Sequence, residues 1–117
     1  MKEDRTYLLH IQECIVRIEE DVRDGRAAFE ASHMVQDAVI RNLQVLAESS
    51  KRLSDTLKAA HPEINWPGIS GFRNLLVHDY FSVDLGIVWQ VVAVDMPSLE
   101  RAVFAMLAGN GGAPENI

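Results

Sequence analysis

Apolar residues recur at helical spacing along most of the chain. In its first part they follow one another at intervals of three and four residues, and charged residues occupy the opposite side. These apolar positions are Leu8, Ile11, Ile15, Ile18 and Val22. Asp24-Gly25 follows this stripe, and glycine readily adopts the left-handed conformation that ends many helices. The pattern predicts a first helix over residues 4–23.

A second, longer helix is predicted over residues 32–60. Ser32 is a suitable N-cap, and Pro62 prevents the helix from continuing much further. The apolar positions form two adjacent lines, so we expect neighbouring elements to pack on two sides. On the polar face, Asp37 precedes Arg41 by four residues, a spacing that favours an ion pair on the surface.

Three shorter helices are predicted in the second half of the chain. Pro67 is suited to the first turn of a helix over residues 67–80. Asp84 is suited to cap a fourth helix that continues to Ala93. Pro97 interrupts this pattern and begins the last helix.

Together these elements predict an all-α fold, an up-and-down bundle of four to five helices with short connections. The 117 residues are enough for one domain with its own core. We assign residues 1–108 to this domain and residues 109–117, which have nothing to bury, to a flexible tail. Trp66 and Trp89 are expected in the core.

The overall charge restricts the partners that the chain can have. It carries 11 Lys and Arg residues against 17 Asp and Glu residues, a net charge of −6. A protein that binds duplex DNA over its whole surface usually carries the opposite sign. We therefore expect no DNA partner, and any contact with another nucleic acid requires a local cluster of cations.

The single cysteine and the distribution of apolar residues exclude other classes. Cys14 alone cannot form an internal disulfide or a zinc site with several thiolates, and its isoleucine neighbours predict a buried thiol. No apolar run is long enough to span a membrane, and the start of the sequence lacks the cleavage site of a signal peptide. We expect a cytoplasmic protein that does not contact membranes.

Neither a metal centre nor a cofactor is expected. Helical bundles that hold two metal ions place Glu-x-x-His on each of two helices, and the chain does not carry that motif on two helices. The glycine cluster at residues 109–112 precedes no predicted helix, so it cannot cradle a phosphate. His10, His33 and His61 are interpreted as ordinary surface residues.

The segment FRNLLVHDYF, residues 72–81, concentrates polar side chains in an otherwise apolar helix. These side chains are Arg73, Asn74, His78, Asp79 and Tyr80. Such mixtures also occur on ordinary amphipathic helices, where the charged residues are solvated and the histidine packs in the core. The residue types alone leave both interpretations open.

The spacing Arg73, four residues, His78, one residue, Tyr80 resembles the Arg-x4-His-x-Tyr motif of HEPN-domain proteins of the HepT-like toxin family. The resemblance extends through INWPGISGFRNLLVHDYFSVDLGIVW and QDAVIRNLQVLAES and covers about residues 4–108. It implies a small all-helical, metal-independent endoribonuclease that acts as a toxin. It also implies a partner, a nucleotidyltransferase antitoxin of the MntA kind that silences the toxin by AMPylation of the motif tyrosine, here Tyr80.

The residue types of the motif suit RNA cleavage. RNA supplies its own nucleophile in the 2′-hydroxyl, so the protein needs only a group that accepts and donates a proton and a cation for the crowded phosphate. Histidine, which titrates near neutral pH, fits the first role, and the planar guanidinium of arginine fits the second. We predict that Arg73 and His78 are catalytic.

Four neighbouring residues are weaker candidates for supporting roles. Asn74 shares a helix face with His78. Asp79 either holds the second nitrogen of the histidine, contacts the partner protein or is simply solvated. Arg41 and Glu48, on the predicted second helix, either support the site by orienting Arg73 or form a purely structural pair.

Helix geometry adds a constraint. At 100° per residue, Arg73 and His78 lie about 140° apart around a regular helix, whereas Arg73 and Tyr80 lie within about 20° of each other. Tyr80 is therefore predicted to line the same cleft as Arg73. Either the helix loosens before His78, or two copies of the segment meet across a two-fold axis; we favour the homodimer.

One alternative belongs to a different functional class. A non-catalytic helical partner or scaffold of a nucleotidyltransferase could use the cluster around Arg73 to hold a nucleotide or a phosphate. The presence of both Arg73 and His78 favours the enzyme, because a scaffold does not require both.

Overall fold

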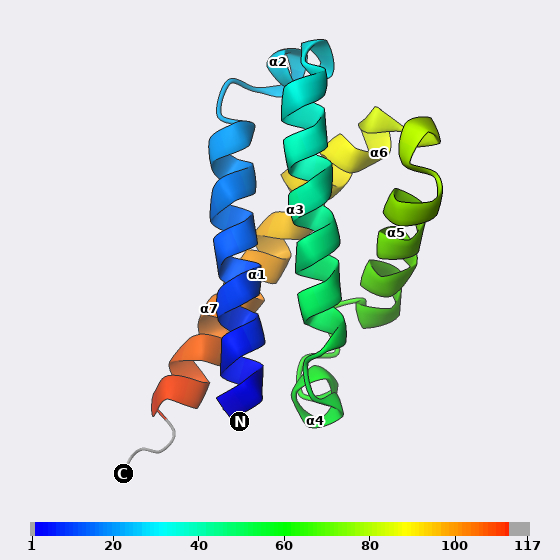
Figure 1. Cartoon of the computed structure of the whole chain (residues 1–117). Helices are drawn as coiled ribbons and strands as arrows, with labels where there is room; N and C mark the ends of the chain where they lie inside the picture. The colour runs from blue at the N-terminus through cyan, green and yellow to red at the C-terminus, as the bar shows by residue number, and fades with distance from the viewer. Residues whose placement is uncertain (1, 113–117) are drawn as a thin grey trace.

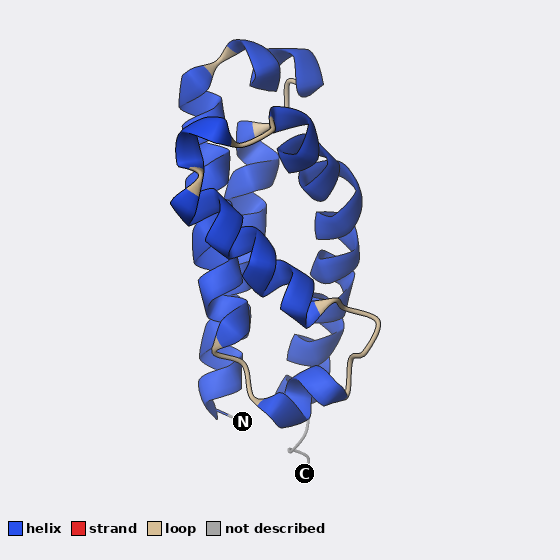
Figure 2. Ribbon diagram, turned by 90° about the vertical axis from the view of Figure 1, so that its right-hand side faces the viewer, coloured by secondary structure: helices blue, strands red, loops and turns tan. Residues whose placement is uncertain are grey.

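In this computed structural model, residues 2–112 are described, and every regular element in that range is helical (Figures 1 and 2). The all-α prediction is confirmed. Four long helices form the bundle: α1 (Lys2–Asp21), α3 (His33–Lys51), α5 (Trp66–His78) and α7 (Met96–Gly112). The short elements are α2 (Arg26–Ala31), α4 (Asp55–Ala59), a 3₁₀ turn (Tyr80–Ser82), α6 (Leu85–Gln90) and a π-helical turn (Val91–Asp95).

The long helices alternate in direction. Figure 1 shows α1, α3 and α5 side by side along the length of the molecule, with α3 in the middle, and α6 to α7 running obliquely across them. The helix α3 packs against both α1 and α5, as its two lines of apolar residues predict. This central position makes α3 the element that relates the motif on α5 to the rest of the chain.

The apolar stripe of α1 forms one side of the core. Leu8, Ile11, Ile15 and Ile18 are fully buried or nearly so, as predicted. Cys14 is also buried, as predicted, and its burial raises the pKa of the thiol.

No helix in the described range is long and apolar enough to cross a lipid bilayer.

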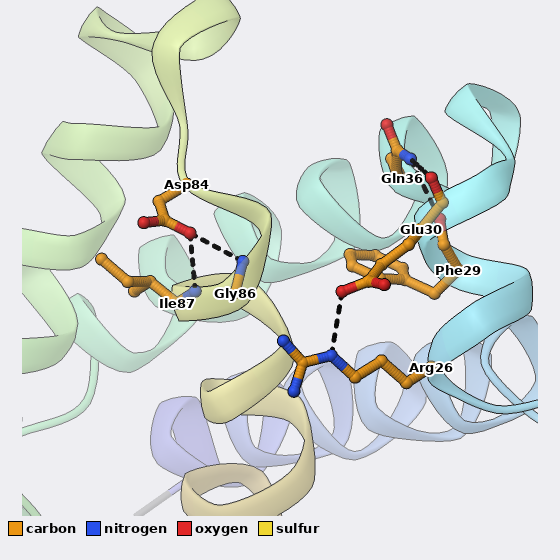
Figure 3. A network of polar contacts seen from close by, with 7 residues as sticks. All are labelled: Arg26, Phe29, Glu30, Gln36, Asp84, Gly86 and Ile87. Atoms are coloured by element: carbon orange, nitrogen blue, oxygen red, sulfur yellow. Dashed lines mark hydrogen bonds and ion pairs between the residues drawn. The ribbon is translucent and has the colours of Figure 1, made fainter.

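The connection between the first two long helices contains a helix that the sequence analysis missed. The helix α2 spans only six residues, too few to show a period, yet its Phe29 is fully buried and its ring lies 5.4 Å from that of Trp89. Gln36 donates hydrogen bonds to the carbonyl oxygens of Phe29 and Glu30, which holds the corner between α2 and α3 (Figure 3). Trp66 and Trp89 pack against the core but are only half-buried.

The prediction of one helix over residues 32–60 is wrong. Ser32 does cap the helix, but α3 ends at Lys51 and α4 begins after Ser54. Ser54 donates from its backbone nitrogen and its hydroxyl to the buried carboxylate of Asp4, at 2.8 and 2.7 Å, and its hydroxyl accepts from the backbone of Leu57. A contact with a residue fifty positions away thus helps to end the helix.

The last third of the chain is one helical segment with a widened turn. Asp84 caps α6 as predicted, accepting from the backbone nitrogens of Gly86 and Ile87 (Figure 3). The prediction that Pro97 separates two helices is wrong. Because Pro97 has no N–H and its ring would clash with the preceding turn, the turn widens to π geometry, and the backbone nitrogen of Met96 donates to the carbonyl of Val91. The helix then continues through Gly112, past the predicted boundary at residue 108; residues 113–117 lie outside the described range.

The buried aromatic contact of α2 generates a stability prediction. Phe29→Ala should lower the free energy of unfolding by about 3–5 kcal/mol, because it leaves a cavity beneath Trp89. Phe104→Ala is the matched control, since Phe104 is 69% exposed and its loss should change stability by less than about 0.5 kcal/mol. Urea denaturation followed by circular dichroism measures both. Equal losses in the two variants would contradict the role of Phe29.

Candidate functional site

Arg73 is held half-buried on α5. Its Nε atom is buried and forms an ion pair with Glu48 of α3, and its Nη1 donates a hydrogen bond of 3.2 Å to Asn74 Oδ1. The side chain of Arg73 is 30% exposed and that of Glu48 is 38% exposed. The structure therefore brings together three residues that the sequence analysis named, with Glu48 orienting the guanidinium from the neighbouring helix.

Glu48 belongs to a polar stripe on α3, made of Asp37, Arg41, Gln44 and Glu48 at intervals of four, three and four residues. Three of these side chains contact the segment that carries the motif. Glu48 contacts Arg73, Gln44 donates to the carbonyl of Leu76, and Asp37 accepts from Tyr80. The contacts follow opposite orders along the two segments: from Glu48 back to Asp37 on α3, and from Arg73 forward to Tyr80 on the segment that carries the motif. The two segments are therefore antiparallel.

A pocket of about 360 Å³ opens between α1, α3 and α5. Its lining residues are Tyr7, His10, Arg41, Gln44, Val45, Glu48, Ser49, Arg52, Arg73 and Val77. Three of them are arginines and one is a glutamate, so with a neutral histidine the lining carries a formal charge of +2 (3 − 1). This local cluster of cations contrasts with the net charge of −6 of the chain.

The second predicted catalytic residue lies elsewhere. His78 is the last residue of α5, is exposed, and does not line the pocket. The α-helix is continuous from Trp66 through His78, so the alternative in which it loosens before His78 is wrong. Within one chain, Arg73 faces the pocket while His78 and Asn74 lie on the exposed side of α5. Asp79 is exposed, and in the described range its carboxylate makes no contact with His78.

Tyr80 begins the 3₁₀ turn that follows α5. Its hydroxyl donates a hydrogen bond of 2.6 Å to Asp37 Oδ1, and this bond, together with partial burial, raises the pKa of the phenol above its ordinary value. Tyr80 does face α3 from the same side as Arg73, but it does not line the pocket. The two contacts, at Asp37 and Glu48, are about 16 Å apart along the axis of α3.

Several of these contacts were not anticipated. The predicted ion pair between Asp37 and Arg41 does not form, because Asp37 binds Tyr80 instead and Arg41 has no acidic partner in the described range. Tyr7, His10 and Arg52 were not recognised as neighbours of Arg73. The polar stripe at helical spacing on α3 is the one signal that could have indicated the side facing α5.

The described residues contain no group of three or more histidine, cysteine, aspartate or glutamate side chains arranged to hold a metal ion. The charged groups around Arg73 are guanidinium ions and a single carboxylate. Such a set suits an anion, and in particular a phosphate, to which a guanidinium donates two parallel hydrogen bonds.

Comparison with known proteins identifies relatives. The protein family described as "Ribonuclease HepT-like" matches residues 11–106. A "Probable ribonuclease HepT" of Thermococcus cleftensis is 39% identical, over 82% of this chain and 88% of its own length. The "mRNA nuclease HepT" of Shewanella oneidensis is 32% identical, over 80% of this chain and 87% of its own length.

One relative is a longer protein whose name includes a second activity. The "Gamma-glutamylcyclotransferase and putative RNase" of Methanocaldococcus jannaschii is 36% identical over 91% of this chain, but the chain spans only 48% of the length of that protein. No solved structure matches the chain significantly.

Proposed function

The chain belongs to the HepT-like ribonuclease family, and we propose that it is a metal-independent endoribonuclease toxin in which Arg73 and His78 act on RNA. The observation that carries this proposal is the placement of Arg73. Glu48 and Asn74 hold its guanidinium at the edge of a positively charged pocket in an otherwise acidic protein. A pre-oriented guanidinium can stabilise charge that develops on a phosphate without reorganising first.

The proposed reaction is transesterification. The 2′-oxygen of RNA attacks the adjacent phosphorus, and the bond from phosphorus to the 5′-oxygen of the next nucleotide breaks. His78 takes the proton from the 2′-hydroxyl and gives it to the 5′-oxygen as that oxygen leaves, while Arg73 stabilises the crowded phosphate. The products are a 2′,3′-cyclic phosphate and a 5′-hydroxyl.

A composite site between two copies fits the geometry of α5. Arg73 and His78 are on different sides of a regular helix, so one copy does not aim both at the same phosphate. A two-fold axis near α5 would bring His78 of one copy toward Arg73 of the other and would double the number of cations at the cleft.

We assign the control of the toxin to Tyr80, through AMPylation by a cognate nucleotidyltransferase antitoxin. Its hydroxyl already donates to Asp37, which is placed to accept the proton when the oxygen attacks the α-phosphate of ATP and pyrophosphate leaves. The modification would replace the hydrogen bond with a negative phosphodiester and a bulky nucleoside. Both changes oppose the approach of RNA, which is also negatively charged.

One observation favours the non-catalytic alternative. The pocket around Arg73 contains no part of His78 within the same chain, and a scaffold that only holds nucleotide or phosphate needs no histidine there. The cleavage assay below separates the two functions.

The purified protein is expected to cleave single-stranded RNA in the presence of EDTA and to leave DNA intact, because DNA lacks the 2′-hydroxyl. Arg73→Ala and His78→Ala should each lower the rate at least about a hundredfold. Gel electrophoresis measures cleavage, and mass spectrometry of the products identifies the cyclic phosphate.

Arg17→Ala is the control for the cleavage assay, since Arg17 is exposed and paired with Glu13 on α1. Activity that EDTA abolishes and a divalent ion restores would refute the metal-free mechanism, and nucleotide binding without cleavage would support the scaffold.

Subunit mixing tests the composite site. Arg73→Ala and His78→Ala proteins, each inactive alone, should recover up to about a quarter of the wild-type activity when mixed, because half of the dimers are mixed and each carries one intact site. Sedimentation velocity is the measurement of the dimer, for which a species of twice the monomer mass is expected. A single species of 13.1 kDa, or a mixture that stays inactive, contradicts a site shared between copies.

Incubation with the cognate nucleotidyltransferase and ATP tests the control point. The wild-type protein should gain about 329 Da for each adenylyl group, and Tyr80→Phe should gain nothing while keeping the ring and its packing. Tyr7→Phe, at the other tyrosine of the chain, is the matched control and should be modified like the wild type. Intact-mass spectrometry gives the result; equal modification of Tyr80→Phe and wild type would remove Tyr80 from this role.

A further inference from the structure

The pocket contains two arginines that neither the motif nor the proposed reaction uses. Arg41 lies on α3, and Arg52 directly follows the last residue of that helix. They are eleven positions apart, which places them on nearly the same side of the helix and about 16 Å apart along its axis. Glu48 lies between them with Arg73 as its partner, so the three guanidinium groups follow one line along α3.

The charges of Arg41 and Arg52 are not neutralised by a neighbour. Both side chains are exposed, and in the described range neither has a carboxylate within ion-pair distance. By contrast, Arg17 and Arg26 each form an ion pair with a glutamate four residues away, at 3.0 and 2.9 Å. The only carboxylate that lines the pocket, that of Glu48, is already paired with Arg73.

Arg52 is nevertheless held in position. Its guanidinium carbon lies over the Tyr7 ring, 5.9 Å from the ring centre. The ring of His10 packs edge-on against that of Tyr7, with ring centres 5.8 Å apart. A cation over an aromatic face is attracted by the ring without losing its charge to a counter-ion. The guanidinium of Arg52 is thus positioned and still able to bind an anion.

The anion that fits this row is the backbone of a nucleic acid strand. Guanidinium groups bind phosphates through parallel hydrogen bonds. A row of such groups can bind several successive phosphates of one strand, whereas a single small anion would contact only part of the row. The one amide in the lining, Gln44, donates to the carbonyl of Leu76 and so does not offer that N–H to a base edge. Contacts of this kind position a strand and read little of its sequence.

We infer that Arg41 and Arg52 bind phosphates of the RNA strand that flank the phosphate at Arg73, with Tyr7 as a positioning residue for Arg52. This inference rests on the proposed function, because it takes RNA as the substrate. It assigns the pocket between α1, α3 and α5 to substrate binding that is tolerant of sequence. The chemical step remains with Arg73 and His78.

The test is the salt dependence of binding to a single-stranded RNA oligonucleotide with 2′-O-methyl groups, which cannot be cleaved through the 2′-oxygen. For single strands, the slope of log affinity against log salt concentration changes by about 0.7 for each phosphate contact. Arg41→Ala and Arg52→Ala should each reduce the slope by about this amount and weaken binding about tenfold at low salt. Arg17→Ala and Arg26→Ala, which remove paired arginines, should leave the slope unchanged.

Tyr7 requires a different readout because it carries no charge. Tyr7→Leu should weaken binding while leaving the slope near that of the wild type, since Arg52 keeps its charge but loses its support. Tyr7→Phe retains the aromatic face and should bind like the wild type. Circular dichroism verifies that each variant is folded.

The outcomes separate this inference from the proposed function. If the arginine variants lose slope in an otherwise inactive protein, the binding assignment stands and the catalytic proposal fails. If the protein cleaves RNA but neither arginine variant changes the slope, the binding assignment is overturned alone. Displacement of the RNA by poly-glutamate at equal charge concentration would also overturn it, because the pocket would then bind acidic peptide equally well.

Discussion

The antiparallel contact between α3 and the segment that follows Trp66 determines where each residue of the site lies. It is made through polar groups at helical intervals: Glu48 meets Arg73, Gln44 meets the carbonyl of Leu76, and Asp37 meets Tyr80. A half-buried guanidinium needs a partner to offset its desolvation, and the carboxylate of Glu48 supplies one. Arg73, held in this way, lines the charged pocket together with residues of α1 and α3.

This arrangement gives an acidic protein a locally positive site. The net charge of −6 is spread over the whole surface and is screened by salt, whereas a pocket lined by three arginines concentrates positive potential in one place. It also divides the motif, because a regular helix turns Arg73 into the pocket and His78 out of it. Within one copy the two side chains therefore do not point at the same place, whereas the pocket around Arg73 is formed by one chain alone.

The buried faces of the long helices and two helix N-caps could be predicted because their signals are local. Apolar spacing along α1 fixes its buried face, and Ser32 and Asp84 accept from backbone nitrogens within three residues, so no distant partner is involved. The interruption after Lys51 and the burial of Phe29 could not be predicted in this way. The first depends on Asp4, fifty residues before Ser54, and the second on Trp89, sixty residues after Phe29.

For the site, local information was enough for the residue types and spacing of the motif, its place on a helix, and the angle of about 140° between Arg73 and His78. The partner of each polar group depends instead on how the helices pack. Asp37 has a suitable local partner in Arg41 but binds Tyr80, and Arg52 joins the pocket through Tyr7 from the first helix. A charged side chain at a helix surface can reach several partners of similar energy, and the packing of α1, α3 and α5 brings one of them within hydrogen-bonding distance.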